Sequence, residues 1–235
     1  MPGAKQLEGD EGCGEAAILP CDSFLREIVG PKDIKLSSLH RRGALLFSEG
    51  QQSSGVYVLR GGRAKVSISS CEGKVLILRI AQSGDLLGVN STLKDSPYDT
   101  TVETLEPCRT DFISRSDFID LLDRSKTARI GVSAALSKEL TEIFEHARSL
   151  LLPKSTAGKL AKLLLKWCDE LGQVRPKGIR VSPGLTQEEI AQMICASRET
   201  VTRLFAELKR KHIVTLADNS IFVRNRRALE SLACC

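Results

Sequence analysis

LTQEEIAQMICASRETVTRLFAEL, residues 185–208, is the stretch that decides how this chain is organised. Thr186 can accept a hydrogen bond at a helix start, and Glu189 lies three residues later, where it completes a capping box. Residues 195–197 are long enough for a tight turn only, and Ser197 can cap a second helix. The stretch therefore predicts two short helices joined by a turn.

The second helix has two faces of opposite character. Apolar side chains recur at i, i+3, i+4 and i+7 and predict a buried stripe, namely Val201, Leu204, Phe205 and Leu208. The opposite face carries side chains able to bond base edges and phosphates in a major groove, namely Arg198, Glu199, Thr202 and Arg203. The alternative is an ordinary surface ion pair between Glu199 and Arg203, which stabilises a helix by only about 0.2–0.5 kcal/mol. The coincidence of caps, turn and polar face favours a helix-turn-helix that binds double-stranded DNA.

The charge of the chain is distributed unevenly. The net charge is +5, and residues 153–235 hold 15 Lys and Arg against 8 Asp and Glu, whereas residues 1–125 hold 15 against 18. The basic excess lies beside the helix-turn-helix and favours a polyanion partner there. No run approaches the roughly 18 apolar residues of a membrane span, and the N-terminus lacks the apolar core of a signal peptide. We therefore expect the protein in the cytoplasm.

The hydrophobic period changes along the chain and indicates its division into parts. Residues 34–112 contain short β-rich runs separated by Gly, Ser, Asp and Pro, which predict a small barrel or sandwich able to enclose a ligand. From residue 116 the period is helical, and two hairpins are predicted at residues 173–184 and 213–225, the second forming a wing. We expect an α+β protein with a mobile tail at 1–17, a β-domain at 18–125, a dimerisation helix at 126–152 and a winged helix-turn-helix at 153–235.

Residues 127–152 form the longest periodic segment. Apolar side chains recur at spacings of 4, 4, 3, 4 and 3, namely Val132, Leu136, Leu140, Ile143, Ala147 and Leu150. Such a helix is roughly 39 Å long at about 1.5 Å per residue, which is too long for one small β-domain to bury. The spacing therefore predicts a two-stranded coiled coil and a homodimer, with a helix buried inside the monomer as the alternative.

Pro153 predicts a break after this helix, because the residue before a proline is disfavoured in the helical region. Ser155 or Thr156 can cap a new helix, and Gly172 can end it. The side chains expected to face inward are Leu160, Leu163, Leu164, Trp167 and Leu171.

The segment ASRETVTRLFAELKRKHIV, residues 196–214, resembles the DNA-binding end of bacterial regulators of the cyclic AMP receptor protein and FNR type, the Crp/Fnr family. In that family the recognition helix opens with SRETV and carries a second Arg downstream. The resemblance implies base contacts by Arg198, Glu199 and Arg203, and phosphate contacts by Ser197, Thr200, Thr202 and Lys209. It also implies an allosterically controlled dimer that works with RNA polymerase.

Cys195 departs from this pattern, because the family commonly has Gly in the turn. A residue other than Gly at positive φ costs on the order of 1 kcal/mol, so we expect a strained turn.

The resemblance extends into the β-domain. The turn glycines and core residues of the family's cyclic-nucleotide-binding β-roll correspond to Gly43, Phe47, Glu49, Gly50, Tyr57, Val58, Gly61, Gly84 and Asp85. These positions build the fold and specify no ligand. The resemblance therefore implies a β-roll, or jelly roll, at 18–125 whose small-molecule effector is unknown.

Cyclic AMP binders of the family present a Glu to the ribose hydroxyl and an Arg, with a neighbouring Ser or Thr, to the cyclic phosphate. The corresponding stretch here is GVNSTLKDSPYDTT, which places the effector pocket at Gly88, Val89, Asp99 and Thr100. Val89 stands at the Glu position and Asp99 at the Arg position, while Thr100 keeps the hydroxyl. An acid facing a phosphate in a partly buried pocket costs several kcal/mol, so we expect poor binding of cyclic AMP.

Two substitutes for the missing Arg remain open. Arg63 or Arg79 can reach the phosphate if a neighbouring strand directs either one toward it. The double change Val89→Glu and Asp99→Arg is expected to recover part of the binding, provided that the β-roll is otherwise intact.

Two other classes of function deserve comparison. A redox or iron-sulfur sensor is suggested by Cys13, Cys21 and Cys108, but the FNR branch uses three closely spaced N-terminal cysteines and one in the β-roll. A cluster is therefore disfavoured, and thiol oxidation is the better form of this alternative. An enzyme is disfavoured because the three histidines lie in separate segments and no phosphate-binding loop is present.

Overall fold

The computed structural model describes residues 36–176, 178–217 and 220–234. Several predictions fall wholly or partly outside the described residues: the tail at 1–17, Cys13, Cys21 and the middle of the predicted wing at 213–225. Among the helices of the described ranges, none has the length and apolar character needed to cross a membrane.

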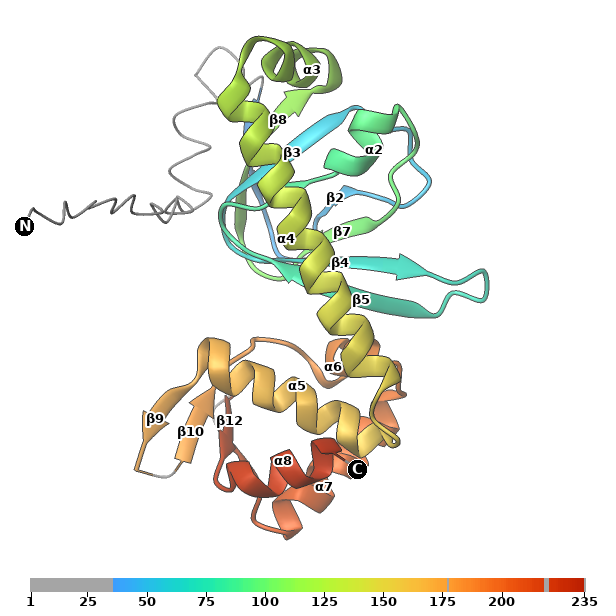
Figure 1. Ribbon diagram of the computed structural model, residues 1–235. Helices are drawn as coiled ribbons and strands as arrows, with labels where there is room; N and C mark the ends of the chain where they lie inside the picture. The colour runs from blue at the N-terminus through green and yellow to red at the C-terminus, as the bar shows by residue number, and fades with distance from the viewer. Residues whose placement is uncertain (1–35, 177, 218–219, 235) are drawn as a thin grey trace, which may run out of the picture.

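Eight strands form two antiparallel four-stranded sheets in the N-terminal domain (Figure 1). The first sheet has the order β1-β8-β3-β6, with β1 (Leu36–His40), β8 (Cys108–Ser114), β3 (Gly55–Gly61) and β6 (Leu86–Leu87). The second has the order β2-β7-β4-β5, with β2 (Leu45–Phe47), β7 (Thr101–Thr104), β4 (Ala64–Ser69) and β5 (Val75–Ala81). The predicted β-domain is confirmed.

A short helix, α2 (Val89–Lys94), interrupts the β-domain between β6 and β7. It begins after Gly88, whose φ of 81° lies in the left-handed region that glycine adopts without strain. A helix of only 6 residues is too short to show a hydrophobic period in the sequence.

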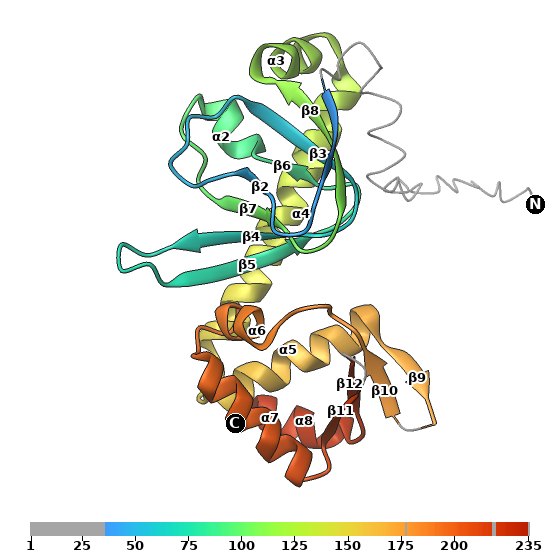
Figure 2. The same cartoon turned by 180° about the vertical axis from the view of Figure 1, so that it is seen from behind.

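Two helices follow the β-domain. Ser114 accepts a hydrogen bond from the Asp117 backbone and starts α3 (Arg115–Arg124). Ser125 caps α4 (Lys126–Leu151), which runs along the β-domain and reaches the C-terminal domain (Figures 1 and 2). The helix ends before Pro153, as the sequence predicts.

The C-terminal domain is a winged helix-turn-helix. It contains α5 (Thr156–Leu171), β9 (Gln173–Arg175), β10 (Gly178–Val181), α6 (Gln187–Met193), α7 (Arg198–Arg210), β11 (Val214–Ala217), β12 (Ser220–Val223) and α8 (Arg226–Cys234). Its antiparallel sheet has the order β11-β12-β10-β9. Both predicted hairpins are present, so the α+β class and this domain type are confirmed.

Helix α5 follows the prediction at its start and departs from it at its end. Ser155 is the N-cap, and the four inward-facing side chains from Leu160 to Trp167 are buried. Leu171 was expected to be buried but is 38% exposed, because it is the last residue of the helix and projects beyond the core. Gly172 ends α5 in an extended conformation, and a Cβ there would lie 2.0 Å from the Cys168 carbonyl oxygen. Glycine is therefore required by close approach of the backbone.

Helix α4 packs against the β-domain through its N-terminal half. Ala128 and Val132 are buried in a cluster with Val56, Val89 and Phe118. A larger cluster fills the C-terminal domain between α5, α6, α7 and α8, and it also takes in Ile77 of β5. The two domains therefore meet through a continuous apolar contact.

Candidate nucleic-acid interface and effector pocket

Helices α6 and α7 both begin with the predicted N-terminal caps. The Thr186 hydroxyl accepts from the Glu189 backbone at 3.2 Å, and the Glu189 carboxylate accepts from the Thr186 backbone at 2.7 Å. The Ser197 hydroxyl accepts from the Thr200 backbone at 3.2 Å and starts α7. Cys195, in the turn between the two helices, has a φ of 53°. This confirms the expectation that a residue other than glycine adopts the left-handed conformation there.

Helix α7 is anchored by its apolar face. Val201, Leu204, Phe205 and Leu208 are all buried, as predicted. The resulting orientation leaves the opposite face toward solvent, with Ser197, Arg198, Glu199, Thr202, Arg203 and Lys209 exposed and Thr200 half-buried. A rigid scaffold thus presents a cationic, hydrogen-bonding helix face of the type that enters a major groove.

The charged side chains of this face are available to a ligand. Arg203 and Lys209 form no side-chain hydrogen bond or ion pair with the rest of the described chain, and no ion pair joins Glu199 to Arg203. The surface-pair alternative is therefore wrong. The pKa of Glu199 is lowered by hydrogen bonds from its own backbone N–H and from the Ser197 hydroxyl, and also by Arg198. As an exposed carboxylate, Glu199 is ionised at neutral pH and can accept hydrogen bonds from amino groups.

Gln187 belongs to the same surface and was missed by the sequence argument. It is the first residue of α6, and its side-chain oxygen is hydrogen-bonded to the Thr202 hydroxyl of α7. The same hydroxyl lies 2.9 Å from the Arg198 carbonyl oxygen. Gln187 therefore fixes Thr202 on the exposed face. The sequence could have indicated this role, because Gln187 directly follows the Thr186 cap and therefore lies at the start of α6.

A buried tyrosine packs against the glycine of the predicted effector pocket. Tyr98 is 2% exposed, stacks on Phe47 with ring centroids 3.9 Å apart, and donates a hydrogen bond to the Gly55 carbonyl oxygen at 2.7 Å. Its ring is so close to Gly88 that a Cβ there would lie 2.7 Å from it. The turn at Gly88 therefore packs on protein rather than opening toward a ligand.

The other three pocket residues are dispersed. Val89 is 3% exposed and packs in the cluster beneath α4. Asp99 is exposed and is hydrogen-bonded to the Asn90 amide, while Thr100 is half-buried. The expectation of a partly buried Asp99 is wrong, because α2 and the Tyr98 side chain occupy the interior and leave Asp99 at the surface.

Arg79 occupies the joint between the β-domain and α4. Its guanidinium lies 2.8 Å from Asp85, 3.3 Å from Glu139 and 3.8 Å from Glu142, and only 7% of the side chain is exposed. Burial alone would lower the pKa of Arg79, but the three carboxylates hold it above its ordinary value. Arg79 and Glu142 also line a cavity of about 480 Å³ between the two domains, whereas the free cavity on the Val89 side of the joint measures about 20 Å³. Such a space holds about one water molecule, whereas small-molecule pockets measure roughly 300–1,000 Å³.

Neither arginine replaces the missing phosphate ligand. Arg79 is committed to the carboxylates at the joint, and Arg63 binds Glu106 and the Pro183 carbonyl oxygen. Burial also raises the pKa of Glu142, although Arg79 and Lys138 oppose that effect. The joint is thus occupied by an internal charge network.

The residues predicted for the dimer interface fall on two sides of α4. Val132 is 7% exposed and Leu136 is half-buried against the same chain's β-domain, and Leu150 packs against the C-terminal domain. Ile143 and Ala147 are half-buried, and Leu140 is 52% exposed. The most exposed apolar side chains of the helix are Ile130, Leu140, Phe144 and Leu151. Three of them are separated from one another by multiples of seven residues, namely Ile130, Phe144 and Leu151.

The described cysteines show no shared site. Cys108 and Cys168 are buried, and burial raises the pKa of each thiol, which suppresses the reactive thiolate. Cys71 and Cys195 are exposed in different domains. The described part of the chain contains no group of three or more His, Cys, Asp or Glu side chains that could hold a metal ion.

The fold and this surface define a class of protein, and comparisons with known proteins identify it. Residues 39–125 match the family model of the cyclic nucleotide-binding domain, and residues 158–232 match that of the Crp-like helix-turn-helix domain. The protein is a DNA-binding transcription regulator. The chain belongs to the Crp/Fnr family.

Two curated relatives illustrate the match. The CRP-like cAMP-activated global transcriptional regulator of Mycobacterium tuberculosis is 26% identical over 80% of this chain and 84% of its own. The anaerobic regulatory protein of Bacillus subtilis is 25% identical over 77% of this chain and 76% of its own. Among solved structures, a CooA mutant from Carboxydothermus hydrogenoformans shares the fold with a TM-score of 0.73 and 20% identity, covering 86% of this chain and 88% of that one.

Proposed function

We propose that the protein binds palindromic DNA as a homodimer and does so without a cyclic nucleotide. The observation that carries the DNA-binding part is the outer face of α7, where Arg198, Glu199 and Arg203 are exposed while the opposite face is fully buried. Arg can bond guanine in two places, and Glu can accept from cytosine, so these three side chains are suited to base edges. Ser197, Thr200, Thr202 and Lys209 surround them at phosphate-contacting positions.

Selection from random duplex DNA tests this proposal. We expect a palindrome with TGTGA-like half-sites whose centres lie about one helical turn apart, since two symmetric recognition helices enter successive major grooves. Recovery of sites without dyad symmetry would contradict the assignment of α7 as a recognition helix in a dimer.

The proposed dimer interface is the exposed apolar face of α4. It consists of four exposed side chains and the half-buried Ala147, which repeat close to the heptad spacing of a coiled coil, the exposed ones being Ile130, Leu140, Phe144 and Leu151. The double change Leu140→Lys and Phe144→Lys should give monomers, because a two-fold interface loses each buried side chain twice, at about 1.5–3 kcal/mol each. Val132→Lys should instead destabilise the packing of α4 against the β-domain, since the Val132 side chain is buried within the monomer. An unchanged dimer in sedimentation of the double variant would place the interface elsewhere.

The proposal that no cyclic nucleotide is needed rests on the lack of free space beside Gly88 and Val89. Tyr98 and the Arg79 network occupy the space beside Gly88 and Val89, and two of the three nucleotide-binding side chains are replaced. The curated relatives include regulators named as cAMP-activated, and the proposal separates this chain from them in its response to cyclic AMP. We further propose that it acts at promoters together with RNA polymerase, as the family resemblance implies.

A further inference from the structure

The DNA-binding domain is docked on the edge of the second β-sheet. Strand β5 lies at the edge of that sheet, and α6 packs beside it (Figures 1 and 2). Ile77 of β5 is fully buried in the apolar cluster of the C-terminal domain, and Ile80 packs against the same cluster. Residues of two domains thus share one core, which restricts rotation about the Pro153 hinge.

Arg63 joins the two domains by a polar contact. Its Nη1 atom donates to the Pro183 carbonyl oxygen at 2.7 Å, in the segment that leads into α6. Its Nε and Nη2 atoms donate to Glu106 at 3.1 and 2.7 Å, which fixes the guanidinium plane. Gly184 has a φ of 67°, and a Cβ there would lie 2.6 Å from Nη2 of Arg63. The Arg63 guanidinium therefore fits against a glycine turn of the other domain.

A second charged contact reaches α6 itself. Lys65 of β4 lies 3.1 Å from Glu103 and 3.8 Å from Glu189, and the Lys65 and Glu189 side chains are 14% and 12% exposed. Glu189 is also the acid of the α6 capping box. The N-terminal turn of α6 is thus held by its own cap and by the β-sheet of the other domain.

We propose that Arg63 is a positioning residue for DNA binding, which holds the helix-turn-helix against the β-domain in an orientation that is competent for DNA. This inference rests on the proposed dimeric DNA-binding function. Docking uses the segment before α6 and the α6 side facing β5, and it leaves Arg198, Glu199 and Arg203 exposed. Because the nucleotide pocket is closed, fixed contacts between the domains take the place of an effector in setting the recognition helices.

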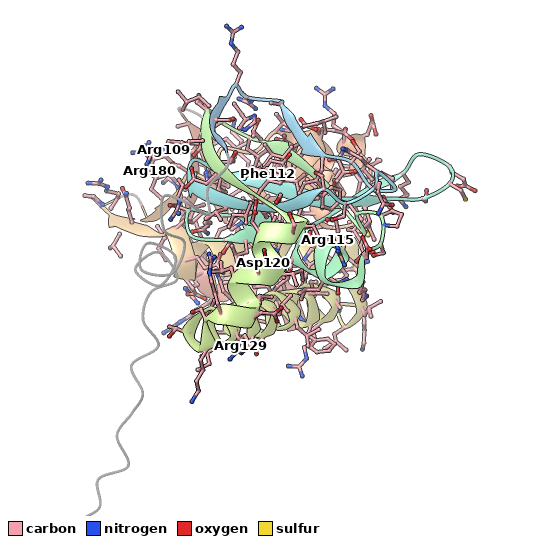
Figure 3. All side chains as sticks on the ribbon, turned by 90° about the horizontal axis from the view of Figure 1, so that it is seen from above. Arg109, Phe112, Arg115, Asp120, Arg129 and Arg180 are labelled. Atoms are coloured by element: carbon pink, nitrogen blue, oxygen red, sulfur yellow. The ribbon has the colours of Figure 1, made fainter. Side chains whose placement is uncertain are left out.

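The test compares Arg63→Ala with a matched control in the full-length dimer, on the palindrome selected for the unmodified protein. We expect Arg63→Ala to weaken specific binding by about three- to tenfold, because the apparent Kd rises as the competent population falls and a dimer needs two competent domains. Arg129→Ala removes the same charge at the start of α4, where Arg129 bonds backbone carbonyls at the α3 junction. That end lies away from the C-terminal domain (Figures 1 and 3). The control should leave the affinity unchanged.

Three further measurements separate positioning from a direct charge effect. Arg63→Ala should keep the slope of log K against log salt, whereas loss of a phosphate contact, as in Lys209→Ala, should reduce the slope by about one per subunit. Glu106→Ala should also weaken binding, although removal of an acid by itself favours a polyanion. Trypsin cleavage after the exposed Lys154 should accelerate in Arg63→Ala and return toward the original rate in Arg63→Lys, which keeps a donor for Pro183.

Equal affinity and equal cleavage for Arg63→Ala and the unmodified protein would overturn the inference and leave the proposed function intact. Tighter binding by Arg63→Ala and Glu106→Ala would also overturn it, because docking would then inhibit DNA binding. A reduced salt slope in Arg63→Ala would assign Arg63 to a phosphate instead. If the unmodified protein selected no DNA sequence at all, both the inference and the proposed function would fail.

Discussion

Helix α7 and the segment around α2 can both be compared with the family pattern, and they match it to different degrees. In α7 the buried stripe and the exposed Arg198, Glu199 and Arg203 are all present. Around α2 the turn at Gly88 is present, but Val89 lies in the core and Asp99 lies at the surface. The fold of a binding site and its ligand chemistry therefore change independently.

The two regions also use charge differently. The charges of α7 are exposed and are free to meet a partner. The charges near the former pocket are turned inward, where Arg79 is enclosed by Asp85, Glu139 and Glu142. A surface charge can therefore be removed at little cost in stability, whereas a buried charge cannot lose its partner without penalty.

Arg198→Ala tests the functional side of this contrast and should have the largest effect. A bidentate contact between Arg and guanine discriminates by about 1–3 kcal/mol, and the dimer loses it twice, so specificity should fall by about 30-fold or more. Lys209→Ala is the control and should weaken binding to all sequences alike. Competition between the selected palindrome and scrambled DNA measures the specificity of both variants. Equal specificity in the two variants would contradict the assignment of Arg198 to a base contact.

The double change Val89→Glu and Asp99→Arg tests the closed pocket. The sequence alone predicts partial recovery of cyclic AMP binding, but Tyr98 packs against Gly88 and the Arg79 network leaves a cavity of only about 20 Å³ beside Val89, so we expect no recovery. In an open pocket the two restored side chains would contribute about 1.5–3 kcal/mol each. Calorimetry with cyclic AMP on the unmodified and double-variant proteins decides this. Stoichiometric binding by either protein would show that the joint opens.

Asp85→Ala tests whether the inward-facing charges are structural. Asp85 is hydrogen-bonded to Arg79 and Lys138, each at 2.8 Å. Its removal leaves the buried Arg79 with weaker partners and should lower the free energy of unfolding by about 3 kcal/mol. Lys138→Ala should cost less than about 1 kcal/mol, because the Lys138 side chain is 55% exposed. Denaturant titrations measure both free energies of unfolding. Equal losses in the two variants would show that the buried and the exposed charge contribute alike to stability.

His146 offers the smallest and most specific effect. Burial and the nearby Lys166 lower its pKa, although a hydrogen bond to the Ile77 backbone opposes this. The folded state therefore favours the neutral ring, and the unfolded chain binds more protons between the lowered pKa and the ordinary value near 6.5. This contribution to stability is present above about pH 6.5 and is lost as the pH falls toward the folded pKa.

The variant His146→Gln isolates that contribution. Its free energy of unfolding should depend less steeply on pH between about pH 7 and pH 5 than that of the unmodified protein. Parallel curves from denaturant titrations at several pH values would show that His146 does not couple folding to protonation.

Much of the fold could be predicted because its signals are local. The caps at Thr186 and Ser197 and the buried stripe of α7 lie within a few residues of the turns that they specify. The dimer helix was harder, because a continuous apolar period does not say which side faces the monomer's own core. Val132 belongs to that core, whereas Phe144, which lies on an adjacent stripe, is exposed.

The sequence by itself determined the helix-turn-helix, the polar face of α7, and that Val89 and Asp99 stand where the family resemblance would place Glu and Arg, since each depends on residue type at short spacing. Only the tertiary structure decided that Tyr98 packs against Gly88, that carboxylates enclose Arg79, and that Arg63 is held by other partners. Arg63 meets Glu106 and Pro183 across 43 and 120 positions of the chain. No local period encodes such contacts, because they exist only once the sheets, α4 and the C-terminal domain have packed together.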